Sequence, residues 1–156
     1  MTYMIEGLAP DRFAPLFAMD DAGLAAINAR RVTATADMGF PCRISLQDAR
    51  AGEELILLHH VSHDVATPYR SAYAIYVRPG VDAARYRDEL PPVFVGRPIA
   101  LRAFGADGML KTAALALPGE ADRAIRDLFA DDAIAYIDAH NAAHGCFAAR
   151  IERDEP

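Results

Sequence analysis

The sequence lacks the features that mark several large classes of protein. It contains no tryptophan and only two cysteines, Cys42 and Cys146, in 156 residues. Two cysteines are too few for a small secreted disulfide scaffold, so we expect both thiols to stay reduced. No stretch approaches the ~18 consecutive apolar residues that span a bilayer, and the first residues lack the basic region and apolar run of a signal peptide. These absences predict a cytoplasmic protein with no membrane partner.

Positive charge is also scarce. Lysine and arginine total 16 against 22 aspartate and glutamate, which gives a formal net charge of −6. Non-specific nucleic-acid binding needs cationic side chains to neutralise phosphates, so we expect no nucleic-acid partner. The motifs GxGxxG, Walker A, HExxH, CxxC and GxSxG are absent as well. Their absence argues against the common nucleotide-binding, zinc-protease, thioredoxin-like and serine-hydrolase classes.

What is present predicts a single α+β domain over residues 1–156, large enough to bury a core without a metal or a disulfide. Apolar spacing predicts helices at 10–17, from 20 or 21 onward, at 82–90 and at 121–129, and strands at 3–8, 31–36, 53–61, 72–77, 99–104, 109–117, 134–140 and 146–151, with a short extended segment at 42–46. Asp107-Gly108 predicts a two-residue hairpin turn. We expect a mainly antiparallel sheet of about seven or eight strands with three or four covering helices, in a single pair of layers.

The last predicted hairpin carries the residues that most suggest catalysis. With a five-residue loop at 141–145, His140 and Cys146 lie opposite each other, with Cβ atoms ~4.5–5.5 Å apart. An imidazole there favours the thiolate, so Cys146 is a candidate nucleophile, His140 its base, and Asn141 a residue that orients the ring. The alternative is a small buried cysteine beside a hydrogen-bonded histidine.

A second set of residues suggests anion binding. Cys42 and Arg43 lie on the short extended segment, and Tyr69 and Arg70 follow a predicted turn. The planar fork of arginine suits a carboxylate or a phosphate. The alternative is a pair of internal salt bridges to carboxylates such as Asp48 or Asp64.

Histidines near the end of the third predicted strand are the remaining candidates. His59 and His60 are adjacent, and His63 follows where the chain can fold back into a ligand-binding pocket. A metal site on a strand prefers the spacing His-x-His, which is missing here. We therefore expect no metal and no cofactor, with a structural zinc site as a minor alternative.

Several of these segments together resemble a bacterial family of uncharacterised proteins, domain-of-unknown-function family 1203. The resemblance spans nearly the whole chain, and its segments are residues 39–46, 67–70, 75–78, 107–108, 140–142 and 145–150. It implies no activity, because none is assigned to the family. It does show that the segments chosen on chemical grounds are those by which the family is recognised.

The residues leave two functions open. In the first, the Cys, His and Arg residues at strand ends form a pocket that binds a small anionic molecule or acts on it as an enzyme. In the second, the protein is a non-catalytic structural or interaction module that can form a homodimer and whose polar residues are internal scaffolding. The sequence does not decide between catalysis and binding.

Overall fold

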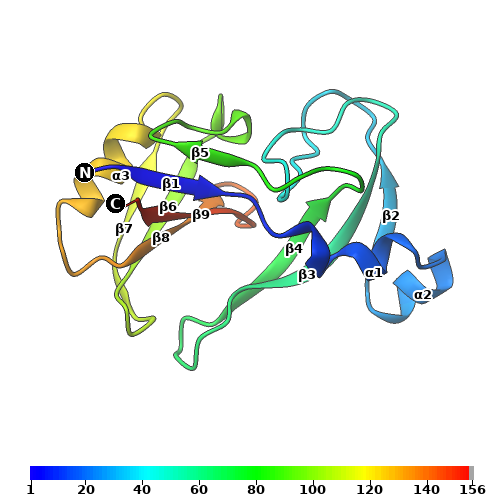
Figure 1. Ribbon diagram of the computed structural model, residues 1–156, viewed down its shortest axis with the longest axis horizontal. Helices are drawn as coiled ribbons and strands as arrows, with labels where there is room; N and C mark the ends of the chain where they lie inside the picture. The colour runs from blue at the N-terminus through cyan, green and yellow to red at the C-terminus, as the bar shows by residue number, and fades with distance from the viewer. Residues whose placement is uncertain (155–156) are drawn as a thin grey trace.

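The computed structural model describes residues 1–154, and within them nine strands form two antiparallel sheets (Figure 1). The six-stranded sheet has the order β5-β1-β9-β8-β6-β7, and the three-stranded sheet has the order β2-β3-β4. The strands are β1 (Tyr3–Glu6), β2 (Arg30–Thr33), β3 (Glu54–His63), β4 (Ser71–Val77), β5 (Arg85–Arg87), β6 (Ile99–Phe104), β7 (Leu110–Ala116), β8 (Tyr136–Asn141) and β9 (Phe147–Arg153). The predicted α+β class is confirmed, but its strands divide between two sheets.

Three short α-helices accompany the sheets: α1 (Ala14–Phe17), α2 (Asp21–Ala26) and α3 (Ala121–Phe129). Helix α3 accompanies the six-stranded sheet, whereas α1 and α2 lie beside the three-stranded one (Figure 1). Single 3-10 turns lie at η1 (Pro10–Arg12) and η2 (Pro92–Phe94). No helix in the described part of the chain is long and apolar enough to cross a membrane.

Each sheet has its own hydrophobic core. Ile125 and Phe129 of α3 are buried together with Leu101 of β6 and Ile137 of β8. Because side chains alternate along a strand, the intervening residues of β6 and β8 point to the opposite face. The six-stranded sheet is therefore apolar towards α3, and it carries polar residues on its other face.

The second core lies on the three-stranded sheet. It joins Phe13 and Leu24 to Ile56 on β3 and to Ile75 and Val77 on β4. Helix α2 starts as predicted, because the side chain of Asp20 accepts a hydrogen bond of 2.8 Å from the N–H of Gly23.

The predicted helix at residues 82–90 is wrong. Strand β5 lies there instead and pairs with β1, with Tyr86 opposite Ile5. Ala84, Tyr86 and Leu90 pack against the core of the six-stranded sheet. Their even spacing suits a strand, in which every second side chain faces the core.

The extended segment predicted at residues 42–46 is a turn. Cys42 forms one bridge with Tyr76, and the N–H of Leu46 then donates to the carbonyl of Cys42 at 3.0 Å. Leu46 adopts a positive φ of 52° that lets the chain reverse. This turn lies between the two sheets and carries Arg43.

The hairpin between β6 and β7 is also longer than predicted. The N–H of Gly105 donates to the carbonyl of Met109 at 3.0 Å, so the loop extends beyond Asp107 and Gly108. Of these two residues only Gly108 has a positive φ, 74°. A single left-handed glycine at the end of the loop is typical of longer hairpin turns rather than of a two-residue turn.

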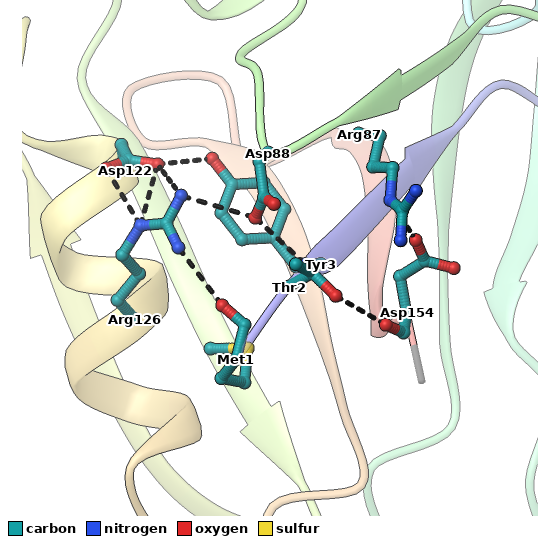
Figure 2. A network of polar contacts seen from close by, with 8 residues as sticks. All are labelled: Met1, Thr2, Tyr3, Arg87, Asp88, Asp122, Arg126 and Asp154. Atoms are coloured by element: carbon teal, nitrogen blue, oxygen red, sulfur yellow. Dashed lines mark hydrogen bonds and ion pairs between the residues drawn. The ribbon is translucent and has the colours of Figure 1, made fainter. Parts of the chain in front are cut away.

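A polar network ties the start of the chain to α3 (Figure 2). The hydroxyl of Tyr3 donates to Asp122 at 2.6 Å, and the guanidinium of Arg126 contacts Asp122 at 3.1 Å and Asp88 at 3.3 Å. Arg126 also donates to the carbonyl of Met1 at 3.2 Å. Burial and the neighbouring Asp122 raise the pKa of Tyr3 above its ordinary value. The network therefore holds Tyr3 as a neutral donor against a paired carboxylate.

Candidate functional site

The turn that carries Arg43 is held from both sides by backbone hydrogen bonds. The N–H of Arg43 donates to the carbonyl of Tyr76 at 3.0 Å, and its carbonyl accepts from Leu8 at 2.8 Å. Gly7 passes so close that a Cβ there would lie 1.8 Å from the carbonyl oxygen of Ile44. Glycine is required at this crossing because any side chain would force the turn away from β1.

The side chain of Arg43 is almost completely buried, with 2% of its surface exposed. Its Nε donates to the carbonyl of Phe147 at 2.7 Å, one Nη donates to the carbonyl of Pro41, and the other donates to Sγ of Cys146 at 3.2 Å. Asp48, which the sequence suggested as a partner, pairs with Arg97 at 2.8 Å instead. Among residues 1–154, Arg43 therefore has no carboxylate at ion-pair distance.

Burial also acts on the charge of Arg43. Desolvation lowers the pKa of Arg43, and the nearby thiols of Cys146 and Cys42 act in the opposite direction. A guanidinium remains charged in proteins, so a buried one needs compensating negative charge. The Sγ of Cys146 is the ionisable atom within hydrogen-bonding distance of the Arg43 guanidinium.

Cys146 lies at the end of the loop that joins β8 to β9. Its carbonyl accepts from the N–H of Asn141 at 2.9 Å, and its Sγ accepts from the side-chain amide of Asn141 at 3.5 Å. Cys146 is partly exposed and faces a hollow of about 200 Å³, which we call the thiol cleft. The lining of the thiol cleft includes Pro41, Arg43, Tyr73, Tyr76, Asn141, His144 and Cys146.

The predicted opposition of His140 and Cys146 is wrong. His140 pairs with Phe147, because the register between β8 and β9 shifts after Ala139 pairs with Ala149. Ala148 is the extra residue of this bulge, and one inserted residue moves every following partner by one position. Among the described residues, Arg43 and Asn141 donate hydrogen bonds to the sulfur.

His140 is buried and faces a different hollow. Its Nδ1–H donates to the carbonyl of Gly145 at 3.0 Å, which leaves Nε2 as the acceptor of the neutral ring. Burial lowers the pKa of His140 below its ordinary value. The ring is therefore neutral at pH 7.

This second hollow has a volume of about 370 Å³ and lies between β4 and the strands β6 and β8; we call it the seam groove. Its lining contains two arginines, two histidines and no carboxylate: Ser62, Arg70, Ser71, Ala72, Tyr73, Arg102, His140, His144, Gly145 and Phe147. Tyr73 and His144 also line the thiol cleft, so the two hollows adjoin.

Arg102 lines the seam groove but was not among the site residues predicted from the sequence. It lies on β6 opposite Asp138 of β8. Both carboxylate oxygens of Asp138 accept hydrogen bonds from Arg150, at 2.8 and 3.1 Å. Arg102 therefore has no ion pair among the described residues. An arginine within the otherwise apolar β6 was a signal that could have identified it.

His63 and Tyr69 lie outside both hollows. The Nδ1–H of His63 donates to the carbonyl of Tyr69 at 2.8 Å, and its Nε2 accepts from the hydroxyl of Tyr136 at 2.8 Å. The ring of His63 also packs 4.1 Å from that of Phe104. With both ring nitrogens bonded, His63 joins the β3–β4 loop to the six-stranded sheet.

Cys42 and Arg70 behave differently from Arg43. Cys42 is fully buried in the second core and lines neither hollow. Arg70 lines the seam groove but forms the predicted ion pair with Asp64, at 3.0 Å. Among residues 1–154, no group of three or more histidine, cysteine, aspartate or glutamate side chains is arranged to hold a metal ion.

The fold and the site define a two-sheet α+β protein with a partly exposed thiol beside a buried arginine and a cationic groove. The chain belongs to the family described as protein of unknown function (DUF1203), which it matches over residues 39–153. The match includes Arg43, Arg102, Asn141 and Cys146. Comparison with curated proteins and with solved structures found no match.

Proposed function

We propose that this protein binds a small anionic molecule in the seam groove. The observation that carries the proposal is the composition of the lining, which contains Arg70, Arg102, His140 and His144 and no carboxylate side chain. In a chain of net charge −6, such a groove is a local exception. A concave surface of one sign concentrates ligands of the opposite sign.

Arg102 is the proposed anchor for the anion. Its guanidinium can donate two parallel hydrogen bonds to a carboxylate or a phosphate. Arg70 contributes less, because it shares its charge with Asp64 at 3.0 Å. Ligand pockets usually measure about 300–1,000 Å³. At about 370 Å³, the seam groove suits a small molecule rather than a polymer.

Neutral His140 adds selectivity to the proposed site. Its Nδ1–H is bonded to Gly145, so Nε2 is left to accept a hydrogen bond from the ligand. The preferred ligand then carries a hydroxyl or an N–H group beside its anionic group.

The alternative of internal scaffolding fits some of the candidate residues. Cys42 is buried in the core, His63 bonds through both ring nitrogens, and Arg70 pairs with Asp64. Scaffolding does not account for Arg102, whose opposite carboxylate is bonded to Arg150.

The test is calorimetric titration of the folded protein with inorganic phosphate and with malonate at constant ionic strength. Arg102→Gln is expected to weaken binding of the preferred anion by about tenfold or more, which corresponds to about 1.4 kcal/mol. The matched control is Arg123→Gln, which removes an exposed arginine of α3 that forms an ion pair with Asp127 at 3.5 Å.

Equal weakening in the two variants would show a general charge effect and would contradict a site at Arg102. Absence of binding by either anion to the unchanged protein would contradict this choice of ligand class.

A further inference from the structure

The hydrogen bonds of Arg43 compensate only part of its buried charge. The carbonyl oxygens of Pro41 and Phe147 accept from it but carry no net charge. Sγ of Cys146, at 3.2 Å, is the ionisable atom that it contacts. In a poorly solvated site, a thiolate there would neutralise the guanidinium, whereas a thiol would leave its charge unbalanced.

The surroundings of the sulfur favour the same form. Arg43 and Asn141 both donate to Sγ, at 3.2 and 3.5 Å. A thiolate accepts hydrogen bonds and has none to donate, so two donors and an adjacent positive charge match its needs. This environment differs from that of Cys42, which is sealed in the hydrophobic core.

The sulfur is also accessible from a cavity. Cys146 lines the thiol cleft, which shares Tyr73 and His144 with the seam groove. A small molecule held by its anionic group in the seam groove therefore lies next to the cavity that contains the thiol. Binding would raise the local concentration of its uncharged end near Cys146.

We propose that Cys146 is a nucleophilic thiolate, stabilised by Arg43 and Asn141, that attacks an electrophilic carbon of a small anion bound in the seam groove. The sulfur lone pair forms a C–S bond, and the bond between that carbon and its leaving group breaks, with the electron pair departing on the leaving group. The thiol proton has already passed to solvent. The choice of an anionic substrate rests on the function proposed for the seam groove, whereas the thiolate rests on Arg43 and Asn141 alone.

The experiment uses two alkylating probes, neutral iodoacetamide and anionic iodoacetate, at neutral pH. Mass spectrometry follows Cys146 and Cys42 separately in the folded protein, and the urea-unfolded chain provides the reference rate. Iodoacetamide is expected to modify Cys146 at least about tenfold faster in the folded protein than in the unfolded chain, because the thiolate is the reactive form. Cys42 is expected to react only after unfolding.

Two variants identify the cause of the reactivity. Arg43→Lys keeps a positive charge but loses the fork, so it is expected to slow modification of Cys146. Because a change at Arg43 can disturb the fold, Asn141→Ala is the second variant; it removes one donor to sulfur and keeps the bonds of Arg43. It is expected to slow the reaction several-fold, with no change in the melting temperature beyond that of Gln47→Ala, which removes an exposed amide side chain.

The two proposals fail in different ways. Arg102→Gln is expected to slow the reaction with iodoacetate much more than the reaction with iodoacetamide, which supports both. A fast iodoacetamide reaction without any effect of Arg102→Gln on iodoacetate would keep the thiolate and overturn the anionic substrate. If folded and unfolded Cys146 react with iodoacetamide at the same rate, or the folded form reacts more slowly, the nucleophilic thiolate is overturned.

Discussion

Arg126 and Arg43 each connect segments that are far apart in the sequence, but they are neutralised differently. Arg126 contacts Asp122 and Asp88 at 3.1 and 3.3 Å and lies 5.0 Å from the ring centre of Tyr3 (Figure 2). Arg43 is more deeply buried and contacts two carbonyl oxygens and a sulfur. An arginine paired with carboxylates has a structural role, whereas an arginine that donates to a thiol places a reactive atom beside a charge.

The same contrast recurs on either side of Asp138. Arg150 takes both oxygens of this carboxylate and lies 4.4 Å from the ring centre of Tyr136. Arg102, on the other neighbouring strand, has no ion pair among the residues described and lines the seam groove. Between two arginines that flank one buried carboxylate, the unpaired one is therefore the better candidate for binding a ligand.

The largest expected effect compares the two connecting arginines directly. Arg43→Met should lower the free energy of unfolding by about 3–5 kcal/mol, because buried carbonyl oxygens of Pro41 and Phe147 lose their donors. Arg126→Met should lower it much less, because its ion pairs are partly solvated. Urea unfolding at pH 7 measures both. Equal losses in the two variants would remove the distinction between a buried and a solvated arginine.

A smaller effect comes from His60, which packs between the two sheets against Phe13 and Phe147, with ring centres 5.9 and 6.4 Å away. Burial, with smaller contributions from Arg12, His59 and Arg43, lowers the pKa of His60 to about 4. Unfolding restores its ordinary value of about 6.5, so the unfolded chain binds the proton more tightly.

The stability contributed by neutral His60 is therefore complete above about pH 6.5 and is lost as the pH falls towards 4. Between pH 7 and pH 4, we expect the free energy of unfolding of His60→Phe to fall by about 2 kcal/mol less than that of the unchanged protein. Urea unfolding at the two pH values measures the difference, and His59→Gln is the control on the same strand. The rest of the pH dependence of stability includes a contribution from His140, because burial also lowers the pKa of His140. Identical pH dependence in His60→Phe and the unchanged protein would contradict the assignment.

The smallest effect concerns the polar network that joins Tyr3, Asp122 and Arg126. Tyr3→Phe removes the hydroxyl that donates to Asp122 at 2.6 Å, but Arg126 still neutralises that carboxylate. We expect a loss of about 1 kcal/mol in the free energy of unfolding and no change in the alkylation of Cys146. A change in that alkylation rate would show that the two arginine clusters are coupled.

Local pattern predicted most of the elements, because it reports which side chains face a core. In α3, Ile125 and Phe129 are buried at the predicted spacing. Residues 82–90 were misassigned because Arg85 and Arg87, the charged residues on either side of Tyr86, suit an exposed helix as well as an edge strand. The bulge in β9 has no clear signal either, since Phe147, Ala148 and Ala149 are all buried and the alternation that sets the register is lost.

The sequence pointed to several residues of the candidate site but not to the partners of their side chains. Arg43, Asn141 and Cys146 were identified by side-chain chemistry, whereas the contact between Arg43 and Cys146 spans 103 positions. Arg102 was missed because its importance depends on Asp138 pairing with Arg150 on the next strand. Such choices between partners are made by tertiary packing, which a single sequence does not show.

The most direct test of the account is the ionisation state of Cys146 in the folded protein. Thiolates absorb in the ultraviolet where thiols do not, so the spectra of the unchanged protein, Cys146→Ser and Cys42→Ser can be compared at neutral pH. The account predicts one thiolate absorbance that is lost in Cys146→Ser and kept in Cys42→Ser. If the spectra of the unchanged protein and of Cys146→Ser show no difference in thiolate absorbance, the account is contradicted.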